Sequence, residues 1–202
     1  MVSLLAGLAA EPAEGSNLGV EPVAEAPAAA RDVRAEEGPP WEQAFLAGLV
    51  LETGLLEGGR ALLGPELEYG HALAQLTPSV ALALGGRGAL LINDHRSAGT
   101  RVETYLVELG PWLELRWLLG ARVLLAGGVG ASLGAGVATT SSSEEGLVGF
   151  GVGFVPTARA RVAFAPFSRV VLSLAGYVGG ALYTGSGMRG VGGFAVSAGV
   201  GF

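Results

Sequence analysis

The sequence predicts an all-β protein, a single eight-stranded antiparallel up-and-down transmembrane β-barrel that follows a disordered N-terminal segment. Two observations lead to this prediction. From Trp41 to Phe202, large apolar residues alternate with small or polar ones, which is the two-residue period of a β-strand. The alternation falls into eight stretches separated by connections of a few residues. Neighbouring strands that are joined so closely must be antiparallel.

The last stretch, Gly190–Phe202, shows the pattern clearly. Large apolar residues occupy even positions, as at Phe194, Val196 and Val200, whereas the odd positions are mostly Gly, Ala and Ser. Strands of soluble proteins are about 5–6 residues long, but a tilted strand that crosses a bilayer needs about 9–11 residues. The length of this stretch therefore favours a membrane barrel over the alternative, a soluble all-β domain.

The composition excludes several classes of protein. The 202-residue chain is 50% hydrophobic and 15% charged, and its 35 glycines follow no G-X-Y period, so it is neither disordered throughout nor collagen-like. It has no cysteine, which excludes disulfides and thiolate metal sites. A net charge of −6 and the lack of a basic patch argue against a nucleic-acid partner. All 12 basic residues are arginine, which suits fixed, buried ion pairs better than lysine does.

Two segments precede the predicted barrel, which covers residues 41–202. Residues 1–10 form a short apolar run that ends in small residues, so we expect a remnant of a signal peptide, with a plain disordered terminus as the alternative. Residues 11–40 are rich in Ala, Pro and Glu and carry seven acidic residues against two arginines. This segment has too little large apolar surface to offset the entropy of ordering, so we expect it to be disordered.

The expected strands alternate with short connections along the chain. The strands are expected over residues 41–53, 60–71, 79–93, 105–117, 121–140, 146–164, 169–183 and 190–202. The loops at one end are expected near residues 54–59, 93–100, 140–145 and 184–188. Loops this short leave little room for an adhesin or receptor surface.

The direction of the apolar face separates a membrane barrel from a soluble one. A soluble barrel would place its large apolar residues inside, and its surface would then consist of Gly, Ala and Ser with few charges and no lysine. An eight-stranded lumen is only just wide enough for side chains to fill, and small residues with a few paired charges suit it. Aromatic residues mark the ends of the apolar stripes, as interfacial girdles do, at Tyr105, Trp117, Phe164 and Phe202. We therefore predict that the apolar face points outward, against lipid.

A helical membrane protein is a further alternative. Residues 118–139 are apolar apart from Arg122, and Gly130–Gly134 matches the small-xxx-small pattern of packed membrane helices. However, each glycine destabilises a helix by about 1 kcal/mol relative to alanine. Helical winding would also mix the two faces that the alternation keeps apart.

Charged residues on the predicted inner face form the candidate site. Three expected strands contain a proline, and the third residue after it is Glu68, Glu114 or Arg159. Two of them carry a further arginine at the fifth position. Charges in a narrow lumen must pair, because desolvation is costly. We expect a closed, charge-paired interior in which Arg159 pairs with Glu68 or Glu114, with an ion path as the alternative. The predicted lumen charge network consists of Glu66, Glu68, Glu108, Glu114, Arg116, Arg159 and Arg161.

Other motifs give weaker indications of chemistry. Residues 185–190 match G-x-G-x-x-G, but a strand rather than a helix follows, so we expect a hairpin and no cofactor. His95 and Ser97, with Glu103 and Glu108 downstream, form the one His/Ser/carboxylate grouping, which a lipid A deacylase would need at its outer rim. We expect His95 and Ser97 in a solvated loop, so no catalytic residue is predicted. His71 is expected at a strand end, and no metal-ligand cluster is expected.

Residues 41–202 resemble the eight-stranded outer-membrane barrels of the OmpA/OmpX type in strand count, lipid-facing alternation and the terminal Phe202. The resemblance implies the outer membrane of a Gram-negative bacterium, with both termini in the periplasm. It also implies that Phe202 is a C-terminal assembly signal read by the outer-membrane assembly machinery. The other implied partners are phospholipid and lipopolysaccharide, and we expect a monomer. In contrast to some members of the family, no C-terminal peptidoglycan-binding domain is expected. A structural, non-enzymatic role in envelope integrity or minor permeation is expected, and a lipid-modifying enzyme such as a lipid A deacylase is the alternative.

Overall fold

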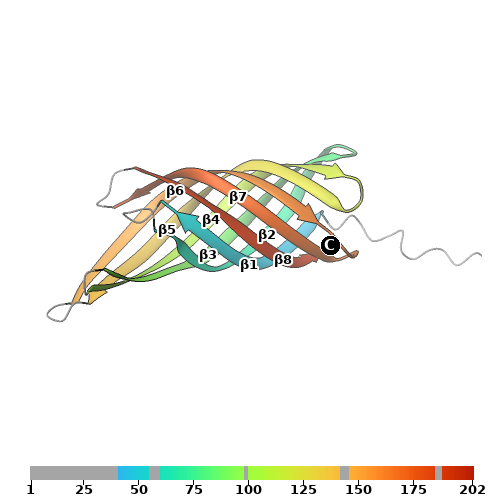
Figure 1. The fold of residues 1–202 in the computed structure, drawn as a ribbon. Helices are drawn as coiled ribbons and strands as arrows, with labels where there is room; N and C mark the ends of the chain where they lie inside the picture. The colour runs from blue at the N-terminus through green and yellow to red at the C-terminus, as the bar shows by residue number, and fades with distance from the viewer. Residues whose placement is uncertain (1–40, 55–59, 98–99, 142–145, 185–187) are drawn as a thin grey trace, which may run out of the picture. The chain divides into compact units, whose positions relative to one another are not determined.

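The computed structural model describes residues 41–54, 60–97, 100–141, 146–184 and 188–202, so the expectations for residues 1–10 and 11–40 lie outside the described residues. Eight antiparallel strands follow one another around a closed barrel, and β8 pairs back with β1 (Figure 1). The predicted up-and-down topology is confirmed. Within the described ranges, the structure contains no helix that is long and apolar enough to cross a bilayer.

Five of the eight strands begin and end within two residues of the predicted bounds, and the second, third and fourth strands differ more. The strands are β1 (Gln43–Thr53), β2 (Leu62–Thr77), β3 (Val80–Ser97), β4 (Thr100–Leu119), β5 (Val123–Ser141), β6 (Gly146–Phe164), β7 (Val170–Tyr183) and β8 (Arg189–Gly201). We call the end with the C-terminus the turn end, and the opposite end the loop end (Figure 1).

The predicted loop over residues 93–100 is wrong, because most of it is strand. Asn93–Ser97 continues β3 and pairs with Thr100–Thr104 of β4. The sequence suggested a loop because the apolar alternation ends at Ile92. Beyond the apolar belt the outward side chains meet water, so polar residues replace apolar ones while the backbone pairing continues. A strand that leaves the bilayer therefore looks like a loop in the hydropathy pattern.

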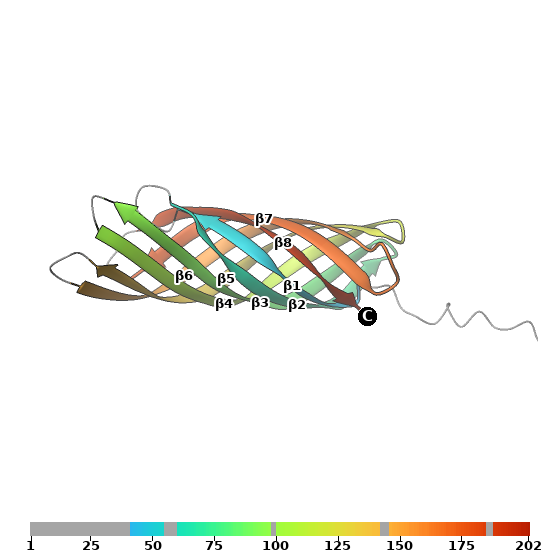
Figure 2. The ribbon, with the colours of Figure 1, turned by 60° about the horizontal axis from the view of Figure 1, so that its bottom comes forward.

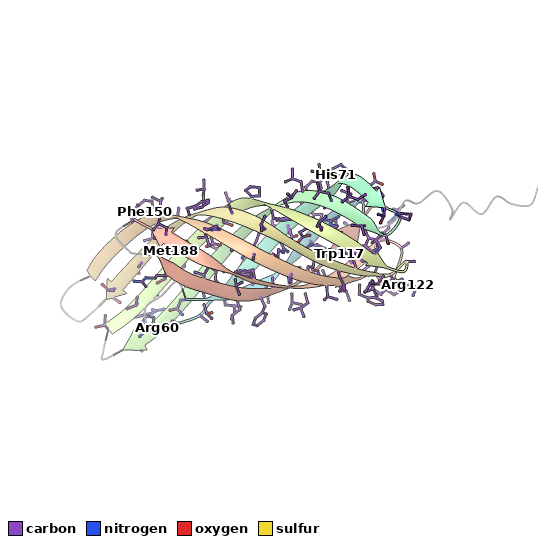
Figure 3. All side chains as sticks on the ribbon, turned by 90° about the horizontal axis from the view of Figure 1, so that it is seen from above. Arg60, His71, Trp117, Arg122, Phe150 and Met188 are labelled. Carbon is purple, nitrogen blue, oxygen red and sulfur yellow. The ribbon has the colours of Figure 1, made fainter. Side chains whose placement is uncertain are left out.

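The predicted end of the second strand at His71 is also wrong, because β2 runs on to Thr77. The register between β2 and β3 shifts twice in this segment, between Ala72 and Ala74 and between Gln75 and Thr77. Each shift disturbs the alternation of faces, so the strand pattern in the sequence is lost here. His71 consequently lies within β2 and not at its end, on the outside of the barrel (Figure 3).

Large apolar side chains project outward around the wall, as predicted (Figure 3). Leu133, Phe150 and Val178 are 70%, 71% and 65% exposed, which is unusual for residues of this kind. Soluble monomers rarely expose large contiguous apolar patches. The outer wall is therefore a surface for lipid, and the alternative of a soluble barrel with an apolar interior is excluded.

The barrel wall is taller on one side. Strands β3 to β6 have 18 to 20 residues, whereas β1, β2, β7 and β8 have 11 to 16. The β3–β4 and β5–β6 hairpins consequently project beyond the rest of the rim at the loop end (Figure 2). A bilayer-crossing strand needs about 9–11 residues, so these hairpins extend well beyond the apolar belt.

The charge-paired lumen as candidate functional site

The inner face of the barrel collects the charged side chains. The alternation of each strand directs one side chain in two inward, and all seven residues of the predicted network lie on this face. Each of these side chains is at most 8% exposed. The seven fall into two groups at different heights along the barrel.

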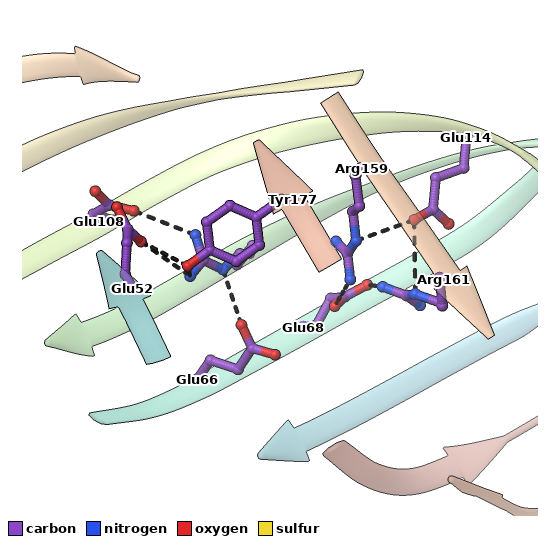
Figure 4. Close-up of polar contacts among 9 residues, drawn as sticks. Glu52, Glu66, Glu68, Glu108, Glu114, Arg159, Arg161 and Tyr177 are labelled. Atoms are coloured by element: carbon purple, nitrogen blue, oxygen red, sulfur yellow. Dashed lines mark hydrogen bonds and ion pairs between the residues drawn. The ribbon is translucent and has the colours of Figure 1, made fainter. Parts of the chain in front are cut away.

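The turn-end cluster contains Glu68, Glu114, Arg116, Arg159 and Arg161. Arg159 lies between the two carboxylates, with its Nη2 atom 2.5 Å from Glu68 Oε2 and its Nε atom 3.3 Å from Glu114 Oε1 (Figure 4). Arg161 also donates to Glu68. We expected Arg159 to pair with Glu68 or Glu114, and it pairs with both. Residues on β2, β4 and β6 are thus linked across the interior.

A single indole supports the three arginines of this cluster. The guanidinium carbons of Arg116, Arg159 and Arg161 lie 5.6, 5.4 and 5.4 Å from the ring centre of Trp112. Cation–π contacts contribute about 2 kcal/mol when they are desolvated. The indole thereby offsets part of the repulsion among three arginines that share two carboxylates.

The loop-end cluster is built around Arg87 and includes Glu66 and Glu108 of the predicted network. The Nε atom of Arg87 donates to Glu66 Oε2 at 2.9 Å, and its Nη1 atom donates to Glu108 Oε2 at 3.2 Å. A third carboxylate, that of Glu52, lies 3.9 Å from Nη2. One guanidinium therefore serves three buried carboxylates.

Two tyrosines of β7 complete the loop-end cluster. The hydroxyl of Tyr177 donates to Glu52 Oε2 at 2.7 Å (Figure 4), and the hydroxyl of Tyr183 is 3.3 Å from Glu108 Oε1. The Arg87 guanidinium also lies 5.0 Å from the centre of the Tyr177 ring. Tyr183 thus lies beside the Glu108 oxygen that Arg87 does not contact, whereas Tyr177 donates to the Glu52 oxygen that also lies nearest Arg87.

Glu52, Arg87, Tyr177 and Tyr183 are absent from the predicted network. Glu52 falls within the predicted strand over residues 41–53, but no proline precedes it in that strand. Arg87 and Tyr177 occupy inward positions of the alternation in their predicted strands, but neither follows a proline. Alternate residues of each strand point inward. A list of every charged or hydroxyl side chain at these inward positions would have identified all four.

The two clusters carry opposite net charge. The loop-end cluster has three glutamates and one arginine, whereas the turn-end cluster has two glutamates and three arginines. Between them lies a cavity of about 30 Å³. A volume of this size holds about two water molecules. The cavity is lined by residues of both clusters, among them Glu66, Arg87, Trp112, Arg159 and Tyr177.

A third group of charges lies on the outer face of the β3–β4 hairpin, near its tip. Arg101 donates to Asp94 through Nε at 3.0 Å and Nη2 at 2.7 Å, and Nη2 is also 2.7 Å from Glu103. The hydrogen bond from Arg101 lowers the pKa of the Asp94 carboxyl below its ordinary value. The side chains of Asp94 and Arg101 are about half exposed, that of Glu103 is 29% exposed, and all three lie beyond the apolar belt.

The candidate catalytic grouping is not assembled. His95 and Ser97 belong to β3 rather than to a loop. The Nδ1 atom of His95 is 2.9 Å from the amide oxygen of Asn93, while Glu103 pairs with Arg101 on the opposite face of the hairpin. Glu108 lies in the lumen among the loop-end charges. The side chain of Ser97 lies outside the described residues.

The other motifs contribute no site. Within residues 185–190, positions 185–187 lie outside the described residues, and Arg189 and Gly190 begin a strand, whereas a dinucleotide motif requires a helix there. No group of three or more His, Asp or Glu residues suited to a metal ion occurs in the part of the chain that the structure describes.

The closed ring of strands, the apolar outer wall and the charged interior together define a class: this is a membrane-spanning β-barrel with the fold of the small outer-membrane proteins. Solved structures of this class are similar to it. The attachment invasion locus protein Ail of Yersinia pestis has 17% identity, covers 79% of this chain and 97% of its own, and superimposes with a TM-score of 0.55.

Two further structures show the same fold. Neisserial surface protein A has 12% identity over 80% of this chain and 97% of its own, with a TM-score of 0.50. A major outer membrane protein from Thermus thermophilus has 14% identity over 79% of this chain and 99% of its own, with a TM-score of 0.50. No protein-family model matches the sequence, and no curated protein matches it.

Proposed function

We propose that the chain is a small, non-enzymatic protein of the Gram-negative outer membrane whose lumen is held closed by ion pairs. Its role would be structural, in envelope integrity, with at most minor permeation. The observation that carries the proposal is the pairing of the lumen charges. Among the described residues, the two clusters contain five glutamates and four arginines, and each of these has an oppositely charged group within 4 Å.

The energetics of these pairs favour a closed interior. Charges that line a water-filled channel are hydrated and need no partners, whereas buried charges must be paired because desolvation costs several kcal/mol per ion. The side chains of Glu52, Glu108 and Glu114 are at most 1% exposed. Ion pairs, tyrosine hydroxyls and the Trp112 ring thus take the place of water along the barrel axis.

The outer wall supports the proposed location and partners. Its apolar side chains match acyl chains, so phospholipid and lipopolysaccharide are the proposed neighbours. Closure between β1 and β8 leaves the barrel wall without a long free edge, which supports a monomer. The terminal Phe202 is proposed as the residue that the outer-membrane assembly machinery recognises.

Single-channel recording tests the closed lumen. The purified protein in a planar lipid bilayer should give no sustained conductance, and the double variant Glu68→Gln/Glu114→Gln should give more, because the three arginines of the turn-end cluster would then repel one another without partners. A steady, salt-dependent conductance of the unmodified protein would overturn the closed lumen.

The enzymatic alternative has a separate test. Lipid A from cells that express the protein should have the same mass spectrum as lipid A from cells that express His95→Ala. A loss of acyl chains that depends on His95 would identify a lipid-modifying enzyme instead.

A further inference from the structure

A second cavity opens at the turn end of the barrel, below the charge clusters. Its volume is about 350 Å³, which falls within the range of about 300–1,000 Å³ that is typical of small-molecule sites. It lies where the residues leading into β1 meet the ends of β2 and β4 and the start of β5. We call it the turn-end pocket; its lining includes Trp41, Ala72–Gln75, Ala81, Arg116, Leu118 and Leu124.

Two buried donors of this lining have no acceptor. Arg116 is 3% exposed and donates from Nη1 to the backbone oxygen of Trp41 at 2.6 Å, but its Nε atom makes no hydrogen bond. The indole Nε1 of Trp41, a residue that is 6% exposed, makes none either. A buried donor without a partner costs about 1–3 kcal/mol. Both atoms are covered in the structure, so a ligand with acceptor oxygens would satisfy the two donors after a small rotation of the indole and the guanidinium toward the pocket.

The charge at this level favours an anionic ligand. Arg116 belongs to the turn-end cluster, in which three arginines share two glutamates, so the cluster has one surplus positive charge. The carboxylate nearest to Arg116 Nε is that of Glu114 at 3.8 Å, which is beyond hydrogen-bonding distance. The pocket also has an acid in its lining, Glu42, but this residue is exposed at the rim, where water screens its charge.

Apart from these groups, the lining is mainly aliphatic. Leu118 of β4 lies opposite Leu124 of β5 in the paired strands, and Ala81 of β3 adds a small side chain. We propose that the turn-end pocket binds a small amphipathic carboxylate. Its carboxylate accepts hydrogen bonds from Arg116 and the Trp41 indole, and its short hydrocarbon chain packs against Leu118 and Leu124. This site is distinct from the closed lumen and does not require conduction through the barrel.

The indole groups of the chain allow a direct test. The sequence has three tryptophans: Trp41 in the pocket, Trp112 in the lumen and Trp117 on the lipid-facing side. The full chain in lipid nanodiscs is titrated with octanoate while the indole N–H signals are followed by NMR. The Trp41 signal should shift and saturate. Trp117 reports partitioning of octanoate into lipid, and its signal should change gradually without saturating.

Matched ligands and variants separate specific binding from partitioning. Octylammonium has the same chain with a positive head, so it should give no saturable shift at Trp41. Arg116→Gln should weaken octanoate binding at least about ten-fold, which corresponds to about 1.4 kcal/mol. Ala74→Leu narrows the pocket from an exposed position and should also weaken binding, whereas Ala198→Leu on the outer wall should not.

Three results would overturn the proposal: parallel, unsaturated shifts of Trp41 and Trp117, equal binding of octylammonium, or unchanged affinity in Ala74→Leu. If Arg116→Gln does not fold, Ala74→Leu decides the question. A conducting lumen would contradict the proposed function but would leave these outcomes unaffected.

Discussion

At the scale of single residues, the lumen is packed by placing glycines opposite large side chains. A Cβ atom at Gly85 would lie 2.3 Å from Cζ2 of Trp112, a distance that no real contact allows. The absence of a side chain at this position is therefore what admits the indole around which three arginines gather. Many inward glycines of the sequence have such a packing role and are not markers of loops.

Two adjacent glycines of β5 test this distinction. At Gly128, which faces inward, a Cβ atom would lie 2.1 Å from the backbone oxygen of Leu113. At Gly127, which faces lipid, the nearest atom belongs to Trp117 at 3.7 Å, an ordinary contact. Gly128→Ala should destabilise the barrel by about 1–3 kcal/mol through overpacking. Gly127→Ala should be neutral or stabilise it by up to about 1 kcal/mol. Urea unfolding in lipid vesicles measures both, and equal effects would contradict the assignment of faces.

The pair of contacts made by Arg159 gives a second prediction at this scale. Arg159→Ala should destabilise the barrel by about 3–5 kcal/mol, because it leaves buried carboxylates uncompensated. Glu114→Ala should also destabilise it. The double variant should lose less than the sum of the two single losses, by about 0.5–3 kcal/mol, since the two groups are in contact. The same urea unfolding assay measures this coupling.

A surface arginine provides the control for that cycle. Arg122 is exposed at the turn end (Figure 3), so Arg122→Ala should change stability by no more than about 0.5 kcal/mol. Strictly additive losses for Arg159 and Glu114 would mean that their charges are separately hydrated, and the closed lumen would then be untenable.

At the scale of the strands, the apolar alternation determined most of the prediction and also its errors. Strands within the apolar belt, such as β6 and β7, were predicted almost to the residue because lipid imposes a large difference between the two faces. The end of β3 was missed because it has water on both sides, so its two faces need not differ in hydropathy. The end of β2 was missed because its shifted register is a property of the pairing with β3, which no single strand's sequence records.

The projecting β3–β4 hairpin gives a prediction about pH. The pKa of Asp94 is lowered mainly by its hydrogen bond from Arg101, with smaller contributions from the charges of Arg101, Arg96 and His95. Because the folded pKa lies below the unfolded one, the stabilisation is present above the unfolded value and is lost as the pH falls through the folded value. Arg101→Gln should raise the pKa of Asp94 toward about 3.9.

Carboxyl NMR of Asp94 between pH 2 and 6 measures the pKa in both forms. The two proteins should differ in the order of this hairpin at neutral pH and become alike in acid. An unchanged Asp94 titration in Arg101→Gln would mean that the hydrogen bond is not formed in solution.

The final strand gives a prediction about assembly. Phe202 exchanges two backbone hydrogen bonds with Gln43, at 3.1 and 2.8 Å, and its ring is 59% exposed on the outside. Phe202→Ser keeps these backbone bonds, so intrinsic stability should change by no more than about 0.5 kcal/mol. Insertion into the outer membrane should fall, because the proposed recognition element is lost.

Fractionation of cells that express each form measures insertion. Phe167→Ser is the matched control, because Phe167 is also an exposed aromatic at the same end, 70% exposed, but is not terminal. Normal levels of Phe202→Ser in the outer membrane would refute the assembly role, and an equal loss in Phe167→Ser would make the effect one of interfacial anchoring.

At the scale of the whole molecule, closure of the barrel leads to a simple prediction. The ring of paired strands satisfies the backbone groups internally, which makes such barrels resistant to detergent. The folded protein in detergent should migrate differently on a gel before and after boiling. Identical migration before and after boiling would indicate that no closed barrel forms.

The lumen shows how far the sequence could lead at this scale. The two-residue alternation of the strands predicted that seven charged residues lie inside. The position of Arg159 relative to its proline predicted its partners. The division into two clusters could not be predicted, because it depends on the offset between strands around the ring. That offset brings Glu66 to Arg87 and Glu68 to Arg159, although the two glutamates are only two residues apart.

This division makes the interior an electric dipole aligned with the barrel axis. Its negative end faces the loop end, where three glutamates surround Arg87, and its positive end faces the turn end. A cation entering from the loop end is first attracted and then repelled, whereas an anion experiences the same sequence from the turn end. Any current through a lumen opened by substitution would therefore rectify, with unequal flow at the two polarities of applied voltage.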